Sequence, residues 1–552
     1  MLPAGSRRTQ DTLYFARFTC ETAPVSRIGL FFKTKFYRTR GVVILILDFG
    51  SQYTQLIARR VRELNVYSEV RPCTSDPQTI DLSGVKGIVL SGGPASVTEA
   101  DAPDFNNQWL STGLPTLGIC YGMQLMAHHF GGTLGRGAAR EYGPSTITVE
   151  RSEGLFARWK KGDSLSVWMS HGDHVERLPE GFVGMASSPG APIAAMQHTS
   201  KPFAALQFHP EVVHTPQGKE MIKSFVHGIA GCKPDWTPGN FIEQSVKRIS
   251  DEVGPTAQAL CALSGGVDST VAAVLVSHAL GKRLHCFFVD NGLLRKGEAE
   301  QVMKRLKALD LNVELVDAGA RFLRELKGVT EPERKRKIIG RVFIEVFEEQ
   351  AKRLQGVSHL VQGTLYPDVI ESVSVRGPSA TIKTHHNVGG LPETLNFKLI
   401  EPFRELFKDE VRALGRELEM PTEILQRQPF PGPGLAVRVL GEVTPERVKT
   451  LQEADSIFLE EVRAEGLYAG LWQSFAVLLP VRSVGVMGDG RTYDETVALR
   501  AVHSEDGMTA DWAFLPESLL RRVSNRIVNE VKGINRVVLD ISSKPPATIE
   551  WE

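Results

Sequence analysis

The sequence predicts an α/β protein with two doubly wound parallel-sheet domains and a C-terminal α+β domain. An apolar run, a glycine turn and a helical pattern follow one another three times before residue 190, and the same order begins again near residue 259. At 552 residues the chain is also too long for one core and suggests three or four domains of roughly 100–200 residues. We expect these domains at residues 42–232, 233–430 and 431–552.

Composition narrows the class of protein. The 42% hydrophobic and 23% charged residues are typical of a soluble globular protein, and 64 basic against 64 acidic side chains leave no net field that would gather nucleic acid. The six cysteines lack C-x-x-C spacing, which argues against a disulfide framework or a zinc site and favours the reducing cytoplasm. No apolar run approaches the ~18 residues that span a bilayer, so we expect no membrane association.

Residues 1–41 differ from the rest of the chain. They carry eight Arg or Lys residues against Asp11 and Glu21, and their apolar residues are irregularly spaced. A transit peptide has this character, but a disordered extension or a start codon assigned too far upstream is at least as consistent with it. We predict no function for this basic extension.

The first domain is predicted from three strand-like runs. Residues 42–50 form an aliphatic run that leads into a helical pattern, and residues 87–94 and 115–132 repeat the order of apolar run, glycine turn and helix. In doubly wound sheets, ligands bind beyond the carboxyl ends of the strands. Candidate site residues are therefore sought at these ends.

A cysteine stands at one such end. Cys120 lies between Gly118 and Gly122 in a G-x-C-x-G sequence, the pattern of a nucleophile elbow, where small neighbours permit a tight turn and the next helix favours the thiolate. A buried structural cysteine at a close-packed turn explains an isolated G-x-C-x-G about equally well. A histidine that could act as base for the thiol would favour a catalytic over a structural cysteine.

His209 and Glu211 supply that partner. They are two residues apart after the apolar run FAALQF, and in an extended chain this spacing puts both side chains on one face. A carboxylate can then orient an imidazole that acts as base for a thiol. A single histidine is more often structural, but together with Cys120 this pair favours a Cys/His/Glu acyl-transfer triad.

GGP at residues 92–94, GICYGMQ at 118–124 and HPE at 209–211 resemble, in this order, the class I glutamine amidotransferases. The resemblance implies that Cys120 attacks the side-chain amide of L-glutamine, His209 transfers the proton and Glu211 orients His209. It also implies an oxyanion hole from backbone N–H groups near Gly93 and Tyr121. The residues that would hold glutamine are Gln124, Ser170 and His171, and the products are glutamate and ammonia.

The second domain opens with a phosphate-type loop that lacks a lysine. After a linker rich in Pro and Gly at residues 232–240, the sequence LSGGVDST at 263–270 lies between a strand pattern and a helix pattern. Ser264, Gly265 and Gly266 leave room for a phosphate, Ser269 offers a hydroxyl, and Asp268 suits Mg²⁺ or ordering of the loop. A lysine that reaches the γ-phosphate is unnecessary when ATP is cleaved between its α- and β-phosphates.

SGGxDS is similar to the loop of the ATP pyrophosphatases, which adenylate a substrate oxygen. A glycine-rich helix entry without function is the weaker interpretation, because serine, paired glycines, aspartate and serine form a specific pattern. An adenylating domain beside an ammonia source implies amination of an activated carbonyl oxygen. NAD synthetases and asparagine synthetases also couple adenylation to an ammonia source, but they use other glutaminase domains.

Further segments resemble the glutamine-hydrolysing GMP synthase family from about residue 42 to the C-terminus. They are RKRKIIGRVF at 334–343, GTLYPDVIES at 363–372, IKTHHNVGGLP at 382–392, RQPFPGPGLAVRVLGE at 427–442, LPVRSVGVMGDGR at 479–491 and KPPATIEWE at 544–552. The resemblance implies that ATP adenylates XMP and that ammonia then displaces AMP to give GMP. The implied ATP-binding residues are Ser264, Gly265, Gly266, Val267, Asp268, Ser269, Val289 and Asp290, with Mg²⁺ as cofactor.

The resemblance also implies an XMP site and a lid. The XMP-binding residues would be Arg336, Lys544, Thr548 and Glu550, although a basic run such as residues 334–337 is usually a solvated helix face. The lid residues would be Asp368, Glu371, Lys383, His385 and His386. Zinc binding by these histidines is disfavoured, because they lack H-x-x-x-H spacing and a nearby cysteine.

The third domain is predicted from a helical pattern at 445–466 and strand patterns near 475–484 and 534–542. The family resemblance implies that this domain forms a homodimer and contributes the XMP contacts. A regulatory nucleotide-binding protein without turnover is the alternative from another class. The presence of Cys120, His209, Glu211 and Asp268 counts against it.

Overall fold

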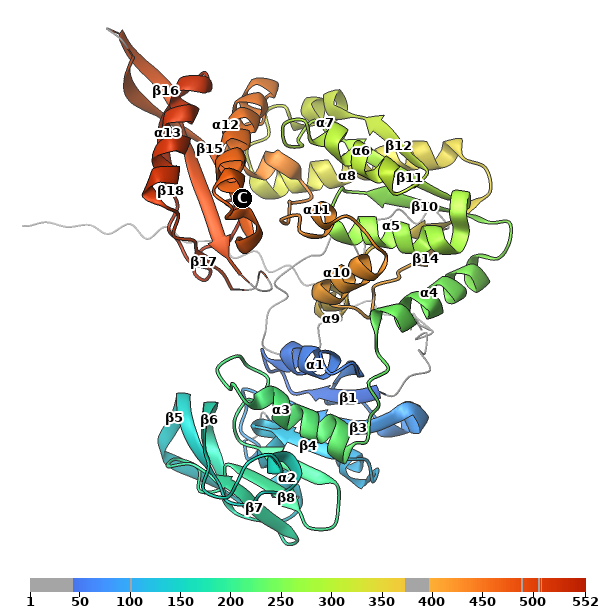
Figure 1. Cartoon of the computed structure of the whole chain (residues 1–552), viewed down its shortest axis with the longest axis vertical. Helices are drawn as coiled ribbons and strands as arrows, with labels where there is room; N and C mark the ends of the chain where they lie inside the picture. Colours follow the sequence, from blue (N-terminus) through green and yellow to red (C-terminus); the bar gives the residue numbers. More distant parts are fainter. Residues whose placement is uncertain (1–42, 100–101, 373–396, 488–489, 505–506, 508) are drawn as a thin grey trace, which may run out of the picture. The chain divides into compact units, whose positions relative to one another are not determined.

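The structure is a computed structural model that describes residues 43–99, 102–372, 397–487, 490–504, 507 and 509–552 (Figure 1). The predicted basic extension therefore lies outside the described residues. The predicted α/β class is confirmed: the described chain contains two large sheets with parallel strands and a third, mainly antiparallel sheet. Among the described helices, none has both the length and the apolar character required to cross a bilayer.

The first sheet has nine strands in the order β2-β1-β3-β4-β9-β8-β7-β5-β6. Five are parallel: β1 (Val43–Asp48), β2 (Tyr67–Pro72), β3 (Val85–Leu90), β4 (Thr116–Ile119) and β9 (Phe203–Leu206). The sheet continues with antiparallel strands β8 (Ala195–His198), β7 (Phe182–Ser187), β5 (Thr133–Val149) and β6 (Ser164–Arg177). The apolar runs of the sequence predicted the parallel strands but not this antiparallel extension.

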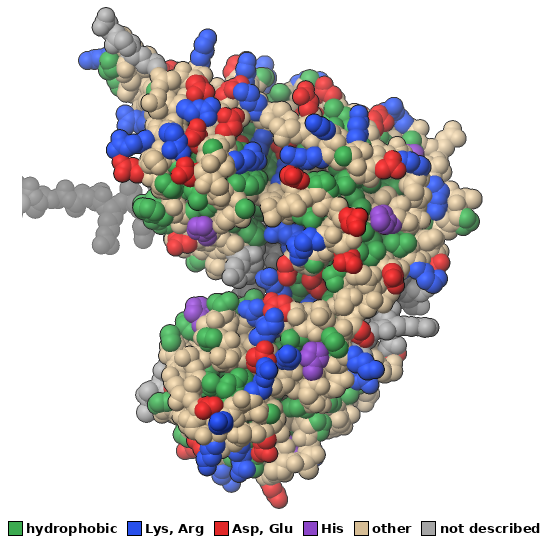
Figure 2. Space-filling model, in the orientation of Figure 1, with side chains coloured by type: hydrophobic (Ala, Val, Ile, Leu, Met, Phe, Trp, Pro, Cys, Tyr) green, Lys and Arg blue, Asp and Glu red, His purple; other side chains and the backbone are tan. Residues whose placement is uncertain are grey.

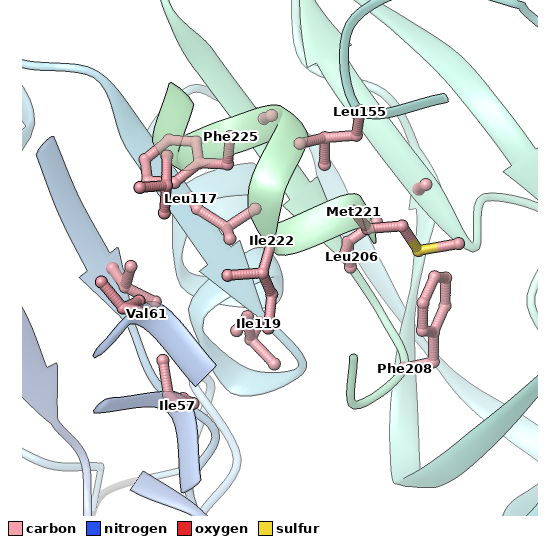
Figure 3. Close-up of a cluster of buried hydrophobic side chains, with 14 of the residues drawn as sticks. Ile57, Val61, Leu117, Ile119, Leu155, Leu206, Phe208, Met221, Ile222 and Phe225 are labelled. Carbon is pink, nitrogen blue, oxygen red and sulfur yellow. The ribbon is translucent and has the colours of Figure 1, made fainter. Parts of the chain in front are cut away.

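Helices pack on the first sheet through apolar side chains. The helical elements are α1 (Thr54–Arg62), α2 (Tyr121–His129), α3 (Gly218–Lys223) and the π-helical η5 (Ser224–Ile229), with short 3-10 turns η1 (Pro77–Thr79), η2 (Leu82–Gly84), η3 (Asn107–Ser111) and η4 (Gly154–Phe156). Figure 3 shows Ile57 and Val61 of α1 near Ile119 of β4, and Ile222 of α3 next to the same strand. These side chains are buried and closely packed, so they hold the end of β4 in place, and Cys120 is the next residue.

The second sheet has five parallel strands in the order β12-β11-β10-β13-β14. They are β10 (Gln258–Leu263), β11 (Leu284–Asp290), β12 (Val313–Asp317), β13 (Val357–Val361) and β14 (Lys398–Ile400). The helices of this region are α4 (Pro238–Val253), α5 (Val267–Leu280), α6 (Glu298–Ala308), α7 (Gly319–Leu326), α8 (Pro332–Arg353), α9 (Tyr366–Ser372), α10 (Lys408–Glu417) and α11 (Thr422–Leu425), with the turn η6 (Gly281–Arg283).

The third sheet is built on a long hairpin. β15 (Gln473–Met487) and β16 (Gly490–His503) are antiparallel, β17 (Asp511–Trp512) extends β16, and β18 (Ile534–Leu539) pairs with β16 in parallel. Helices α12 (Pro445–Ala464) and α13 (Glu517–Glu530) lie against this sheet, and the turns η7 (Gly434–Val437) and η8 (Tyr468–Gly470) precede it (Figure 1). The predicted third domain is thus α+β, with strands longer than the sequence patterns suggested.

The second and third sheets share one buried cluster. Leu293 and Phe322 from the second region pack with Leu435, Phe458 and Leu499 of the third. On the face shown in Figure 2, the described basic and acidic side chains are interspersed, in keeping with equal numbers of each in the chain. The shared cluster packs α12 and the third sheet against α7 and α8 of the second region.

Candidate active sites

Cys120 lies at a strained turn between β4 and α2. Its backbone has φ 51° and ψ −103°, a conformation that an L-residue adopts rarely and that recurs at functional sites. A Cβ on Gly122 would lie 2.3 Å from the carbonyl oxygen of Leu90, and one on Gly118 would lie 2.6 Å from the carbonyl oxygen of Gly122. The two glycines of G-x-C-x-G are therefore required by the packing of the turn itself.

His209 and Glu211 lie close to Cys120, as the spacing predicted. Nδ1 of His209 is 2.7 Å from Oε1 of Glu211, both side chains are buried, and Cys120 is near enough to raise the pKa of His209. The local structure differs from the expectation, because β9 ends at Leu206 and both residues belong to the following turn rather than to an extended strand. The turn that follows β9, not strand alternation, brings the two side chains together.

The electrostatics of His209 favour its protonated form. Burial lowers the pKa of His209, but the Glu211 carboxylate and the hydrogen bond with Cys120 raise it, and the pKa is well above the ordinary value. A protonated imidazole beside the sulfur can stabilise a thiolate, the form in which cysteine acts as a nucleophile. The cluster can therefore perform acyl transfer.

Two neighbours of this cluster were missed by the sequence analysis. The side-chain amide of Gln207, which is fully buried, lies with Nε2 3.9 Å from the sulfur of Cys120, and the ring of Tyr53 packs edge-on against His209 at 5.1 Å. Gln207 precedes His209 by two residues, and Tyr53 follows the DFG turn of β1. Neither position carries a signal that would distinguish it from a core residue.

The predicted oxyanion and glutamine residues lie around Cys120. A Cβ on Gly92 would lie 3.1 Å from Cε1 of His209, so the loop that carries Gly93 approaches the imidazole, and Tyr121 directly follows Cys120 at the start of α2. The carbonyl of Ser170 accepts a hydrogen bond from the Cys120 thiol at 3.6 Å.

Gln124 and His171 both have polar neighbours in the described chain. Nε2 of Gln124 donates to the carbonyl of Asp173 at 2.7 Å, and Nε2 of His171 lies 3.3 Å from Oε2 of Glu141. Burial lowers the pKa of His171, while Glu141 opposes that shift. A role of either side chain in holding glutamine remains a prediction.

Replacing Glu211 by glutamine is expected to move the alkaline limb of the pH profile of the predicted glutamine hydrolysis to lower pH. The Glu211 carboxylate raises the pKa of His209, so without it the imidazolium loses its proton, and the thiolate its partner, at a lower pH. The measurement is kcat/KM for the predicted glutamine hydrolysis between pH 6 and pH 10, with Glu153→Gln as a surface control, since Glu153 is 58% exposed and lies near Arg151. An unchanged alkaline limb would contradict the assignment of Glu211.

The SGGVDS loop lies between β10 and α5, at the carboxyl edge of the second sheet. Gly265 has φ +69°, which glycine adopts readily, and Gly266 is the N-cap of α5. The N–H of Gly266 donates to Oγ of Ser264 at 3.3 Å, and the hydroxyls of Ser264 and Ser269 are 3.2 Å apart. The loop therefore gathers backbone N–H groups and two hydroxyls at a helix N-terminus, where Val267 begins the helix.

Asp268 stands in the first turn of α5 and is incompletely paired. Its Oδ2 is 3.7 Å from Nζ of Lys408, and its Oδ1 is buried without a hydrogen-bond partner in the described chain. Groups of three or more potential metal-ligating side chains are not found among the described residues. A lone buried carboxylate oxygen is suited to a cation that arrives with phosphates, as Mg²⁺ usually does.

Val289 and Asp290 end β11, the strand next to β10. Because Leu263 pairs with Phe288 in the parallel register, these residues emerge at the same edge as the loop. Val289 is buried in the shared apolar cluster, and Oδ1 of Asp290 accepts a hydrogen bond from the N–H of Gly292 at 2.9 Å. The register thus brings both residues to the edge that carries the loop, and their role in binding ATP stays a prediction.

The four predicted XMP residues lie in or against the C-terminal tail. Arg336 donates to the carbonyl of Glu552, and the hydroxyl of Thr548 donates to the carbonyl of Glu550. Nζ of Lys544 donates to the carbonyl of Gly507 at 2.7 Å. The tail is thus tied to α8 and to the loop before β17.

Buried basic residues that were not predicted as site residues hold this tail in place. Arg438 binds the carboxylate of Glu550 at 2.8 and 3.0 Å, and Arg500 donates to the carbonyls of Thr548 and Ile549. Lys335, within the basic run at residues 334–337, is fully buried and binds Glu552. Burial lowers the pKa of Lys335, while Glu552 raises it.

The predicted lid is only partly described. Asp368 lies in α9, where its Oδ2 accepts a hydrogen bond from the N–H of Leu365 at 3.0 Å. Glu371 belongs to the same helix, but its side chain is outside the described part of the structure. Lys383, His385 and His386 also lie outside the described residues.

A nucleophile elbow with its His/Glu pair and a phosphate-type loop at a second sheet together define a glutamine-dependent ligase that uses ATP. The family model "Glutamine amidotransferase class-I" matches residues 45–229, and "GMP synthase C terminal domain" matches residues 460–551. The chain belongs to the family of glutamine-hydrolysing GMP synthases, since its similarity to them extends over nearly their whole length.

Two relatives illustrate this similarity. The glutamine-hydrolysing GMP synthase of Chlorobium chlorochromatii is 60% identical over 515 residues, which cover 92% of this chain and 99% of that protein. The corresponding enzyme of Brachyspira hyodysenteriae is 57% identical over 511 residues, with the same coverage of each chain. Among solved structures, a glutamine amidotransferase from Thermotoga maritima aligns with 34% of this chain and 98% of its own, at 18% identity and a TM-score of 0.29.

Proposed function

We propose that this chain makes GMP from XMP, ATP and L-glutamine, with glutamine hydrolysis at Cys120, His209 and Glu211 and with adenylation at the SGGVDS loop. The observation that carries the proposal is the buried contact of Cys120, His209 and Glu211 in the same chain as the phosphate-type loop. Membership of the glutamine-hydrolysing GMP synthases supplies the overall reaction.

Glutamine hydrolysis would proceed through a thioester. The sulfur of Cys120 attacks the amide carbon of glutamine, the carbon–nitrogen bond breaks, and His209 delivers the proton that leaves with ammonia. Water then cleaves the thioester to give glutamate and restore the thiol. The N–H groups of Gly93 and Tyr121 would stabilise the oxyanion, and Glu211 keeps the imidazole oriented and protonated.

Adenylation would occur at the carboxyl edge of the second sheet. The C2 oxygen of XMP attacks the α-phosphorus of ATP, pyrophosphate leaves, and ammonia then displaces AMP from C2. The N–H groups and hydroxyls of Ser264, Gly265, Gly266 and Ser269 would hold the β- and γ-phosphates. Bound Mg²⁺ would supply charge neutralisation there, and the unpaired Oδ1 of Asp268 fits it.

XMP would bind at the C-terminal tail through Arg336, Lys544, Thr548 and Glu550. Glu550 is held by Arg438, and its Oε1 also accepts a hydrogen bond from Nε2 of Gln473 at 3.1 Å. A carboxylate fixed by two donors can accept from the purine ring of XMP without reorganising. Asp368 and Glu371, together with Lys383, His385 and His386, would close over the nucleotide as a lid.

The third domain would join two copies of the chain. Val484, Val486 and Tyr493 of the β15–β16 hairpin are each more than half exposed, and Val484 faces Tyr493 in the strand register. Val486 lies on the same face, two residues further along β15. Such an exposed apolar patch on a sheet suits a homodimer contact. Sedimentation should give twice the mass of the chain, and the mass of one chain would contradict the dimer.

The compartment proposed is the cytoplasm. The described cysteines, Cys73, Cys120, Cys232, Cys261 and Cys286, are free thiols, and Cys120 must remain reduced to act as a nucleophile. Burial raises the pKa of Cys73 and of Cys232 to about 11, which keeps these two thiols unreactive. Reduced cysteines of this kind are typical of cytoplasmic enzymes.

Phosphorus NMR tests the proposed reaction directly. The protein is supplied with ATP, Mg²⁺, XMP and ammonium, without glutamine, and we expect AMP and pyrophosphate to form one for one with GMP. Formation of ADP and phosphate would mean that the loop does not adenylate. Absence of any ATP cleavage with XMP would contradict XMP as the acceptor.

A further inference from the structure

An arginine outside all of the predicted site residues contacts the phosphate-type loop. The guanidinium of Arg427, in the RQPFPGPG segment, donates through one nitrogen to the carbonyl of Gly265 and through the other to the carboxylate of Glu298. A Cβ on Gly265 would lie 2.9 Å from the guanidinium, so the contact also requires glycine at this position. The side chain of Arg427 is 15% exposed.

The contact fixes the direction of one peptide group. In a trans peptide the C=O and the following N–H point in opposite directions. Because Arg427 binds the C=O of Gly265, the N–H of Gly266 points away from Arg427, toward Oγ of Ser264. That is the side on which the loop gathers its hydroxyls and on which α5 presents its N-terminus.

Both ends of Arg427 are anchored. Glu298, at the start of α6, is buried and also accepts a hydrogen bond from the N–H of Arg295 at 2.7 Å. In the next residue, Oε1 of Gln428 accepts from the N–H of Ser474 at 2.8 Å. The guanidinium therefore reaches Gly265 from a backbone and a carboxylate that are themselves held in place.

We propose that Arg427 is a positioning residue that holds the Gly265–Gly266 peptide in the orientation that binds the pyrophosphate moiety of ATP. This inference rests on the proposed binding of the ATP phosphates at the SGGVDS loop. Gly265 has no side chain to restrict its own rotation, so an unsupported peptide could turn its carbonyl toward the phosphates and repel them. Arg427 prevents that rotation and adds positive charge behind the loop.

The charge persists at neutral pH. Burial, together with the nearby charge of Arg295, lowers the pKa of Arg427 to about 10, and Tyr468 opposes this shift. The guanidinium thus remains protonated at pH 7 and can donate both hydrogen bonds. Lysine at this position would keep the charge but not the two-pronged geometry.

Inhibition by the reaction products distinguishes a positioning role of Arg427 at the loop from a general structural role. Pyrophosphate and AMP occupy different halves of the ATP site, so a loop defect should weaken inhibition by pyrophosphate alone. For Arg427→Met, assayed in the full-length enzyme with ammonium, we expect inhibition by pyrophosphate to weaken about ten- to a hundredfold, as for loss of a charged hydrogen bond. Inhibition by AMP should stay within about twofold, and Arg427→Lys should lie between the wild type and Arg427→Met.

Arg283→Met is the matched control. Arg283 also donates to a glycine carbonyl in this region, that of Gly254 at 2.7 Å, but it does not contact the loop. It should leave inhibition by both products unchanged. If Arg427→Met does not accumulate as folded protein, Arg427→Lys decides: weaker inhibition by pyrophosphate with unchanged inhibition by AMP supports the proposal.

Three outcomes would overturn it. Unchanged inhibition by pyrophosphate in the Arg427 variants would mean that the loop does not need this residue. Equal weakening of inhibition by pyrophosphate and AMP would indicate a general structural defect. Ser264→Ala tests the underlying assignment: if this loop variant also leaves inhibition by pyrophosphate unchanged, the phosphates do not bind at the loop and the inference fails with that assignment.

Discussion

Replacing Cys120 by alanine should abolish glutamine-dependent GMP formation while ammonia-dependent formation stays within about twofold of the wild type. The sulfur supplies the covalent step of glutamine hydrolysis, and loss of a nucleophile commonly lowers turnover by a factor of about 10³ or more. Alanine leaves the turn intact, since Gly118 and Gly122 rather than the thiol satisfy its close packing. The measurement is GMP formation with glutamine and, separately, with ammonium.

Cys73→Ala is the control for this experiment. Cys73 is a buried free thiol of the same domain, outside the Cys120 cluster, and its replacement should leave both rates near those of the wild type. If Cys120→Ala lost both routes, the two reactions would not be divided between two sites as proposed. If it retained the glutamine route, another residue would be the nucleophile.

Replacing Asp268 by asparagine should lower both the glutamine-dependent and the ammonia-dependent route by a factor of about 10² to 10³, the usual effect of removing one preorganised electrostatic group. Asparagine has nearly the same shape but lacks the negative charge that the buried Oδ1 would offer to Mg²⁺. The apparent affinity for Mg²⁺ should fall as well. The measurement is GMP formation with ammonium as a function of Mg²⁺ concentration.

Asp251→Asn provides the matched control. Asp251 lies in α4 of the same region and pairs with Lys247 on the surface, at 2.9 Å, so its replacement should change neither rate. Retention of full activity in Asp268→Asn over the whole range of Mg²⁺ would contradict a role for this carboxylate in the ATP site. Loss of the glutamine-dependent route alone would mean that Asp268 acts in glutamine hydrolysis rather than in the ATP site.

Much of the architecture could be predicted because its signals are local. The aliphatic run before Asp48 and the run before Ser264 each predict a buried parallel strand, and both strands are present. The antiparallel strands β5 to β8 were not predicted, although β6 alternates exposed and buried positions over much of its length. Their pairing depends on contacts between segments far apart in the chain.

The candidate sites show the same division. Cys120 and the SGGVDS loop were found because small residues at fixed spacing are needed for their turns. Gln207 and Arg427 were missed because a glutamine or arginine in an apolar or proline-rich segment has many equally plausible roles. Only the folded chain shows that they contact Cys120 and Gly265, respectively.

The sequence by itself determined the α/β class, the position of the elbow cysteine and the type of phosphate loop, because steric requirements within a few residues leave little choice of residue there. The tertiary structure alone decided which charged residues are buried, such as Lys335 and Arg438, and which peptide of the loop is braced by Arg427. Burial and long-range hydrogen bonds depend on the packing of distant segments, and a local pattern carries no record of that packing.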